Sequence, residues 1–104
     1  MSLKYRIDVF KDGKNITANF DLQVTDTSST ELISDFHLNV DDKNLVPEFQ
    51  PGQARFNGTR SSILTNPDQD ATVTFDISSN NGFTASDSDT LRGSKLRDSS
   101  TFTN

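Results

Sequence analysis

The stretch GKNITANFDLQVTDTSSTELISDFHLNV, residues 13–40, decides the fold that we expect for this chain. Apolar and polar side chains alternate within residues 15–25 and again within residues 32–40, and the polar residues 26–30 separate the two runs. Because successive side chains of a strand point to opposite faces, each run predicts a strand with one buried side and one solvated side. Two such strands joined by a polar turn predict an antiparallel pair that shares one buried face.

Strand signals of similar strength lie on both sides of this stretch. Residues 3–9 alternate in the same way, and the Asp-Gly dipeptide at residues 12–13 predicts a tight hairpin between them and residues 15–25. Residues 71–77 predict another clear strand, bounded on both sides by turn-forming residues.

Other segments give weaker signals. Residues 45–52 contain two prolines, which predict a short edge strand or a covering loop. Residues 54–56 and 63–64 predict two weak strands, the first of them ended by Asn-Gly at residues 57–58. Apolar positions are sparse in residues 83–104, so we expect at least one strand there beside a partly irregular segment.

Composition sets the class of fold. The 104 residues suffice for one domain, residues 1–104, with a single core. Only 31% of the residues are hydrophobic, so the core must be thin, as between two sheets packed about 10 Å apart. The sequence therefore predicts an all-β protein, an antiparallel β-sandwich of six to eight short strands.

Charge and residue usage exclude several functions. A net charge of −5 argues against a nucleic-acid partner, which requires clustered Lys and Arg. No stretch approaches the roughly 20 apolar residues of a membrane-spanning helix, so membrane insertion is not expected. With no cysteine and a single histidine, His37, and without a Gly-x-Ser-x-Gly segment, the chain is not expected to be an enzyme.

Calcium is the one cofactor that the sequence suggests. Carboxylates on turn segments at one end of a sandwich can converge on Ca²⁺, a cation that prefers oxygen ligands. The alternative is that these carboxylates are ordinary solvated turn residues. The candidate ligands come in two pairs, namely Asp68, Asp70, Asp87 and Asp89.

The solvated face of the predicted central pair offers a candidate binding site. Planar amides and carboxylates arrayed on a sheet suit hydroxyl-rich ligands, whose oxygens both donate and accept hydrogen bonds. Sugar sites also use aromatic platforms, and here several phenylalanines are candidates, although each can instead fill the core. An ordinary solvated sheet face is the alternative. The candidate ligand-binding residues are Asn19, Asp21 and Gln23 on one strand and Asp35, His37 and Asn39 on the next, and the candidate platforms are Phe10, Phe49, Phe56, Phe83 and Phe102.

The run FDLQVTDTSST at residues 20–30, leading into ISDFHL at residues 33–38, resembles passages of immunoglobulin-like β-sandwich modules. It is similar to the strand–TNTGS–strand passage of family-2-type carbohydrate-binding modules and to the opening strands of adaptin-type ear domains. NPD at residues 66–68 with TVTF at residues 72–75 resembles the late strand of both. The chain lacks tryptophan, which forms the flat cellulose-binding surface, and counterparts of the basic peptide-binding residues of ear domains. The resemblance covers about half of the chain and implies an immunoglobulin-like accessory module without naming a ligand.

These observations predict a non-catalytic binding or interaction module with an unidentified protein or carbohydrate partner. One alternative is a structural subunit of the coat or fibre type that self-associates through an edge strand into a homo-oligomer. The other is a carbohydrate-binding module that uses the polar sheet face. An extracellular or surface-associated location is favoured over a cytosolic one, and residues 1–2 fit either a native start or a cloning remnant.

Overall fold

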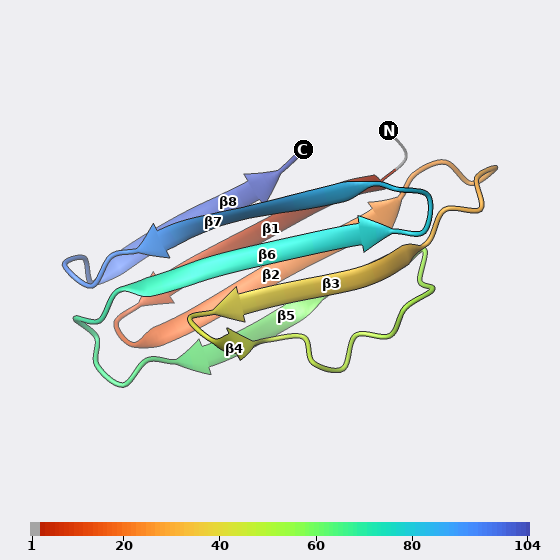
Figure 1. The fold of residues 1–104 in the computed structure, drawn as a ribbon. Coiled ribbons are helices and arrows are strands. Elements are labelled where there is room, and N and C mark those ends of the chain that lie inside the picture. The colour runs from red at the N-terminus through yellow and green to blue at the C-terminus, as the bar shows by residue number, and fades with distance from the viewer. Residues whose placement is uncertain (1–2) are drawn as a thin grey trace.

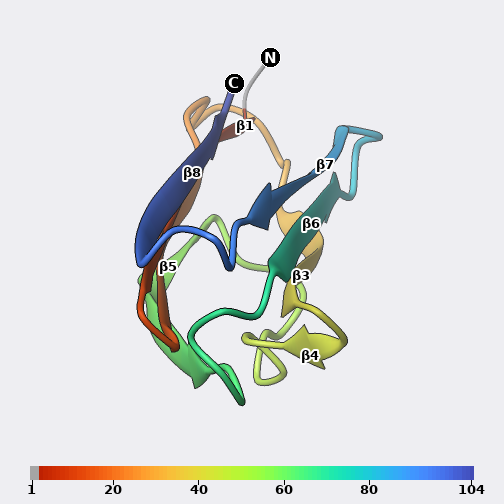
Figure 2. The same cartoon turned by 90° about the vertical axis from the view of Figure 1, so that its left-hand side faces the viewer.

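The structure is a computed structural model that describes residues 3–104, so the prediction about residues 1–2 lies outside the described residues. Residues 3–104 form eight strands and no helix, which confirms the all-β prediction. The strands make two four-stranded antiparallel sheets that face each other as the layers of a sandwich (Figure 1 and Figure 2).

Sheet A has the strand order β5-β2-β1-β8, and sheet B has the order β4-β3-β6-β7. The strands of sheet A are β5 (Arg55–Ile63), β2 (Asn15–Val24), β1 (Leu3–Asp12) and β8 (Arg97–Thr103). The strands of sheet B are β4 (Lys43–Asn44), β3 (Ile33–Val40), β6 (Ala71–Ser79) and β7 (Thr84–Leu91).

The predicted pairing of residues 15–25 with residues 32–40 is wrong. Both segments form strands, but β2 pairs with β1 and β5, whereas β3 pairs with β4 and β6. Residues 25–32 form a crossing between the layers rather than a hairpin turn. Eight extended residues span more than the roughly 10 Å between packed sheets. Alternation identifies the buried side of each strand. The buried side of β2 is the same whether β3 pairs with β2 in one sheet or faces β2 across the core.

Two local features shift the expected positions by one residue. The loop residues of the first hairpin are Gly13 and Lys14, with φ of 61° at Gly13, because Asp12 pairs with Asn15. A glycine with positive φ at the first loop position is typical of a type II′ turn. In β3, the ladder shifts between Ile33 and Asp35, so Ile33 rather than the predicted Leu32 enters the core.

In the second half of the chain one prediction is corrected, and the prediction of at least one strand within residues 83–104 is confirmed. Residues 54–56 and 63–64 are not separate strands, since β5 runs unbroken through Asn57 and Gly58. A Cβ at Gly58 would meet the flexible end of Arg60, 2.7 Å from Nη1, and would lie in ordinary contact with Phe20 Cζ at 3.4 Å. Residues 83–104 are largely ordered into β7 and β8, which are edge strands and need few apolar residues.

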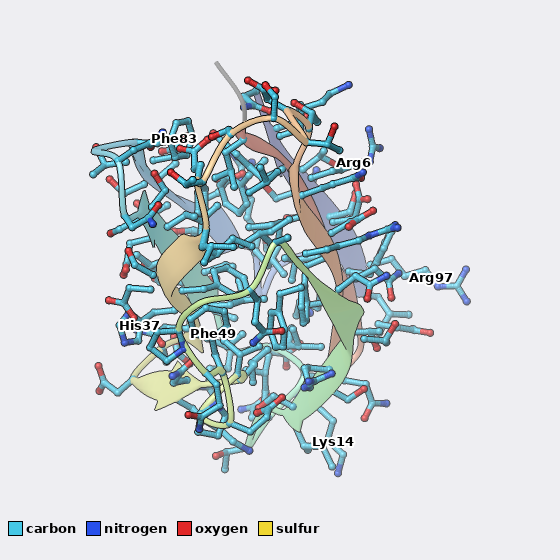
Figure 3. The ribbon with its side chains drawn as sticks, turned by 90° about the vertical axis from the view of Figure 1, so that its right-hand side faces the viewer. Arg6, Lys14, His37, Phe49, Phe83 and Arg97 are labelled. Carbon is cyan, nitrogen blue, oxygen red and sulfur yellow. The ribbon has the colours of Figure 1, made fainter. Side chains whose placement is uncertain are left out.

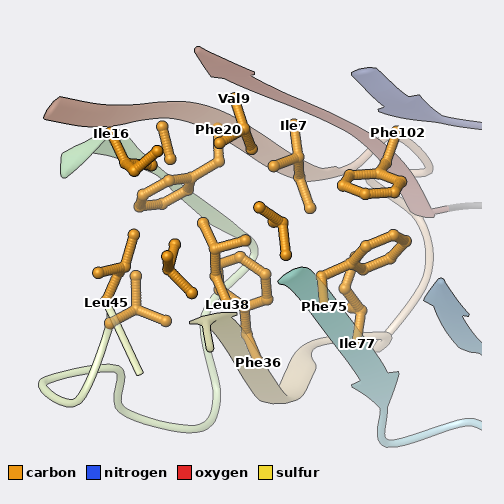
Figure 4. Close-up of a cluster of buried hydrophobic side chains, with 14 of the residues drawn as sticks. Ile7, Val9, Ile16, Phe20, Phe36, Leu38, Leu45, Phe75, Ile77 and Phe102 are labelled. Atoms are coloured by element: carbon orange, nitrogen blue, oxygen red, sulfur yellow. The ribbon is translucent and has the colours of Figure 1, made fainter. Parts of the chain in front are cut away.

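The core lies between the two sheets and is rich in phenylalanine. Figure 4 shows side chains of β1 and β2 facing those of β3 and β6. Phe36 is 1% exposed, and its ring centroid lies 5.4 Å from that of Phe20. Phe75 lies in a second group of rings, 5.3 Å from Tyr5 and 4.9 Å from Phe102. The predicted inward side of the first three strands is therefore confirmed.

Candidate binding surfaces

The six predicted ligand-binding residues do not form one surface. Asn19, Asp21 and Gln23 lie on β2, in sheet A, and the other three, Asp35, His37 and Asn39, lie on β3, in sheet B. Since the polar sides of the two sheets point away from each other, the sandwich separates the two groups. Figure 3 shows this separation, with His37 on one outer face and Arg6 and Arg97 on the opposite one.

On the outer face of sheet A, residues of three strands stand in rows. Asn19 pairs with Asp8 of β1 on one side and with Thr59 of β5 on the other. In the next row Asp21 lies between Arg6 and Asn57. The structure thus brings Asn19 and Asp21 together with residues that the sequence did not nominate. Arg6 and Asp8 share the outward parity of their strand, and this signal was sufficient to find them.

Hydrogen bonds fix the orientation of several of these groups. Thr59 Oγ1 donates to Asn19 Oδ1 at 2.7 Å. Asp21 accepts two hydrogen bonds from Arg55, at 3.1 and 2.9 Å. Asn19 Nδ2 and the Asn57 amide form no hydrogen bond with another residue of the described chain. A polar ligand would therefore meet pre-oriented groups with free donors and acceptors.

Hydrogen bonds from neighbouring side chains stabilise the charged form of Asp8. Thr101 Oγ1 donates to one carboxylate oxygen at 2.7 Å, and Arg6 Nε donates to the other at 2.9 Å. The hydrogen bond from Thr101 is the main reason why the pKa of Asp8 lies below its ordinary value, and Arg6 adds to the effect. Asp8 is consequently a fixed acceptor on this face at neutral pH.

The same face carries a shallow hollow and an exposed aromatic ring. The hollow has a volume of about 340 Å³, and its polar lining includes Arg6, Asp8, Asn19, Asp21 and Asn57. Phe10 follows on β1 with the same outward parity, opposite Thr17 and Ser99, and is 46% exposed. Of the other candidate platforms, Phe102 is buried, and three pack partly buried against the core, Phe49, Phe56 and Phe83.

On the outer face of sheet B, two carboxylates surround a histidine. His37 Nδ1 lies 3.0 Å from Asp76 Oδ1 and 3.6 Å from Asp35 Oδ2. Among residues 3–104, these are the three His, Cys, Asp or Glu side chains that bring ligand atoms within 4.8 Å of one another. They are therefore the described residues that could jointly contact a metal ion. The prediction that His37 faces away from the core is confirmed.

The interaction with Asp76, aided by Asp35, raises the pKa of His37 above its ordinary value. A raised pKa in the folded state stabilises the fold below the unfolded value of about 6.5, and this stabilisation is lost as the pH rises through the folded value. The side chains are about half exposed, so we expect the free energy of unfolding to fall by less than about 1 kcal/mol between pH ~6 and pH ~8.5. Urea unfolding at the two pH values measures this change. The variant His37→Gln should not show this fall in the free energy of unfolding. An equal pH dependence in both proteins would contradict the interaction of His37 with Asp76 as its cause.

The four aspartates proposed as calcium ligands do not converge. Asp68 and Asp70 lie between β5 and β6, and Asp70 Oδ1 accepts a hydrogen bond from Gly93 N at 2.6 Å. Asp87 and Asp89 lie within β7 rather than on a turn. Within residues 3–104, no three of these four carboxylates bring their oxygens within 4.8 Å of one another. The premise of the calcium prediction, a shared loop cluster, is therefore wrong.

Comparison of the chain with family models, curated proteins and solved structures finds no match. The part of the chain from residue 3 to residue 104 contains no helix long and apolar enough to cross a membrane.

Proposed function

We propose that this protein is a non-catalytic binding module that takes a hydroxyl-rich ligand, a carbohydrate, on the outer face of sheet A. The observation that carries the proposal is the exposed ring of Phe10 on the same face as the hollow lined by Asn19, Asn57 and Arg6. A flat apolar ring on the same sheet face as oriented polar groups suits an extended sugar ligand, because a sugar ring has apolar C–H faces and an edge of hydroxyls.

The polar groups complement hydroxyls in both directions. Asn19 and Asn57 contribute amide donors, Asp8 contributes a carboxylate acceptor, and Arg6 contributes further donors. The hollow is shallow and lies on a sheet surface rather than in a deep cleft, which supports binding rather than catalysis. The surface on sheet B has no exposed aromatic ring among its described residues, so it is the weaker candidate for a sugar.

We also propose that the sandwich is of the immunoglobulin-like type. In that type the first, second and fifth strands share one sheet, and the third, sixth and seventh share the other. The distribution of β1, β2 and β5 against β3, β6 and β7 supports this assignment. The short β4 at the edge beside β3 and the added β8 beside β1 are extensions of the same plan.

Binding to a glycan array, followed by titration with the best oligosaccharide, tests the proposed ligand. We expect Phe10→Ala to weaken binding about tenfold, because an aromatic contact contributes up to about 1.5 kcal/mol. Asn19→Ala should weaken binding by a similar factor through lost hydrogen bonds. His37→Ala, on the opposite face, is the control and should bind as the wild type does.

Two outcomes contradict the proposal. An array without any bound glycan at high protein concentration removes the ligand class. Binding that is lost in His37→Ala and kept in Phe10→Ala moves the site to sheet B and shows that the sheet A surface is an ordinary solvated face.

A further inference from the structure

The free edges of the two sheets differ in how their backbone groups are occupied. The edge strand β4 has only two residues. The hydrogen bond from Ser79 N to Phe83 O starts the ladder between β6 and β7. Because the bonded residues alternate along an antiparallel strand, the N–H groups of Ser88 and Thr90 point toward the free edge of β7. Asp87 Oδ1 and Asp89 Oδ1 accept those two N–H groups, each at 2.8 Å. The aspartates of β7 therefore cap the edge against strand pairing.

On the edge of β8, a carboxylate occupies one outward N–H group, that of Ser99, while those of Arg97, Thr101 and Thr103 have no acceptor within the described chain. Asp98 Oδ1 accepts the N–H of Ser99 at 3.0 Å, and Asp98 Oδ2 accepts the N–H of Arg92 at 3.0 Å. Ser100 Oγ donates to Asp89 Oδ2 at 2.7 Å and thereby ties β8 to β7 on this side of the sandwich. Figure 2 shows these two strands closing the same side of the molecule.

The edge of β5 has no such caps. Two hydrogen bonds continue its ladder with β2 at either end, from Val24 N to Ala54 O and from Leu64 N to Lys14 O. Since antiparallel pairs alternate, the even-numbered residues of β5 bond to β2, and the odd-numbered ones direct their N–H and C=O groups outward. Over the nine residues Arg55–Ile63 there is no proline and no carboxylate. The outward N–H groups donate to no acceptor within the described chain, and they belong to Arg55, Asn57, Thr59, Ser61 and Ile63.

We propose that a second copy of this chain pairs with β5 along this edge, antiparallel and about a two-fold axis at Thr59, so that the two copies of sheet A form one eight-stranded sheet. Of the three edge strands longer than two residues, β5 is the longest, and it is the one that carries no carboxylate. Pairing β5 with β5 is isologous, and it closes as a dimer because both copies use the same edge.

The register centred on Thr59 is the one that the sequence of β5 favours. It pairs all nine residues, and it places outward-directed odd residues opposite odd residues, as the hydrogen bonds require. Arg55 then faces Ile63 of the second copy, and Arg60 faces Gly58, so no arginine stands directly opposite another. The central pair is Thr59 with Thr59, a favourable cross-strand combination.

Arg60 is compatible with this interface. It points to the inner side of the sheet, since its pairing partner is the buried Ala18. There it forms an ion pair with Glu48 and lies over the Phe20 ring, 5.4 Å from the centroid. Its Nη1 also donates to Thr59 O, but a carbonyl oxygen has two lone pairs and can accept a second hydrogen bond. The positive charge is therefore already paired before a second copy arrives.

Sedimentation equilibrium of the whole chain, without any glycan, tests this inference independently of the proposed ligand. We expect a monomer–dimer equilibrium that strengthens with salt, because salt screens the repulsion between two chains of net charge −5. Thr59→Pro removes an outward N–H that β2 does not use, so it should abolish the dimer and keep the fold. Thr101→Pro is the matched control, since Thr101 holds the equivalent outward position on β8, and it should leave the dimer intact.

A charge exchange at the axis keeps the test decisive if a proline variant unfolds. Thr59→Lys and Thr59→Glu each place like charges opposite each other, and each should weaken the dimer about tenfold. An equimolar mixture of the two should restore it, because residue 59 then faces its opposite charge. A wild type that is monomeric at millimolar concentration overturns the inference. So does a Thr59→Lys variant that dimerises as the wild type does, or a mixture that stays monomeric.

Discussion

Replacing Phe36 by alanine is expected to lower the free energy of unfolding by about 4 kcal/mol. The side chain is 1% exposed and lies at the centre of the sandwich, where its ring meets Phe20 from sheet A and the partly buried Phe49 and Phe56. Removing it deletes apolar contacts on several sides and leaves a cavity that two hydrogen-bonded sheets cannot collapse to fill. A loss of this size is a large part of the 5–15 kcal/mol typical of a domain.

Urea unfolding followed by circular dichroism measures this loss. The control is Phe10→Ala on β1, which removes the same ring from an outer face and should change the free energy of unfolding by less than about 0.5 kcal/mol. Equal losses in the two variants would mean that Phe36 does not occupy the core.

The sequence indicated which side of each strand is buried but not which strand lies beside which. Period-2 alternation placed Phe36 inward and His37 outward, and the structure confirms both. The same alternation is satisfied when β2 and β3 pair in one sheet and when they face each other across the core. Only the pairing with β5 and β6, distant in sequence, decides between the two arrangements.

This ambiguity also explains the outcome for the candidate site. Asn19 and Asp21 were selected for their chemistry, and their true neighbours come from β1 and β5. Phe10 shares the outward parity of Arg6 and Asp8, so sequence reasoning could have placed it on that face. Asn57 could not be found in this way, because Asn-Gly is a common turn signal and β5 overrides it.

The aspartates of β7 illustrate how one residue pattern admits two physical meanings. Alternating aspartates suggested oxygen ligands for a cation, since carboxylates on turns often bind calcium. In the sheet, Asp87 and Asp89 each bond to the N–H of the following residue at the free edge. The pattern therefore describes a protected edge strand, a role that becomes visible only when the strand's position at the edge is known.

Gly93→Ala is expected to lower the free energy of unfolding by about 3 kcal/mol or more. Gly93 is buried in the connection between β7 and β8, and a Cβ there would lie 1.9 Å from Asp68 O and 2.4 Å from Asp68 C. Because the clashing atoms are backbone, no side-chain rotation relieves the overlap, and residues 66–70 must move away.

Moving this loop would also break the hydrogen bond from Gly93 N to Asp70 Oδ1 and expose the adjoining ends of β6 and β7, where Ala71 pairs with Leu91. Urea unfolding should show a lower midpoint with an unchanged m-value. Ser94→Ala, an exposed position in the same connection, should behave as the wild type does. A Gly93→Ala protein whose free energy of unfolding lies within about 0.5 kcal/mol of the wild-type value would show that residues 66–70 do not pack against this connection.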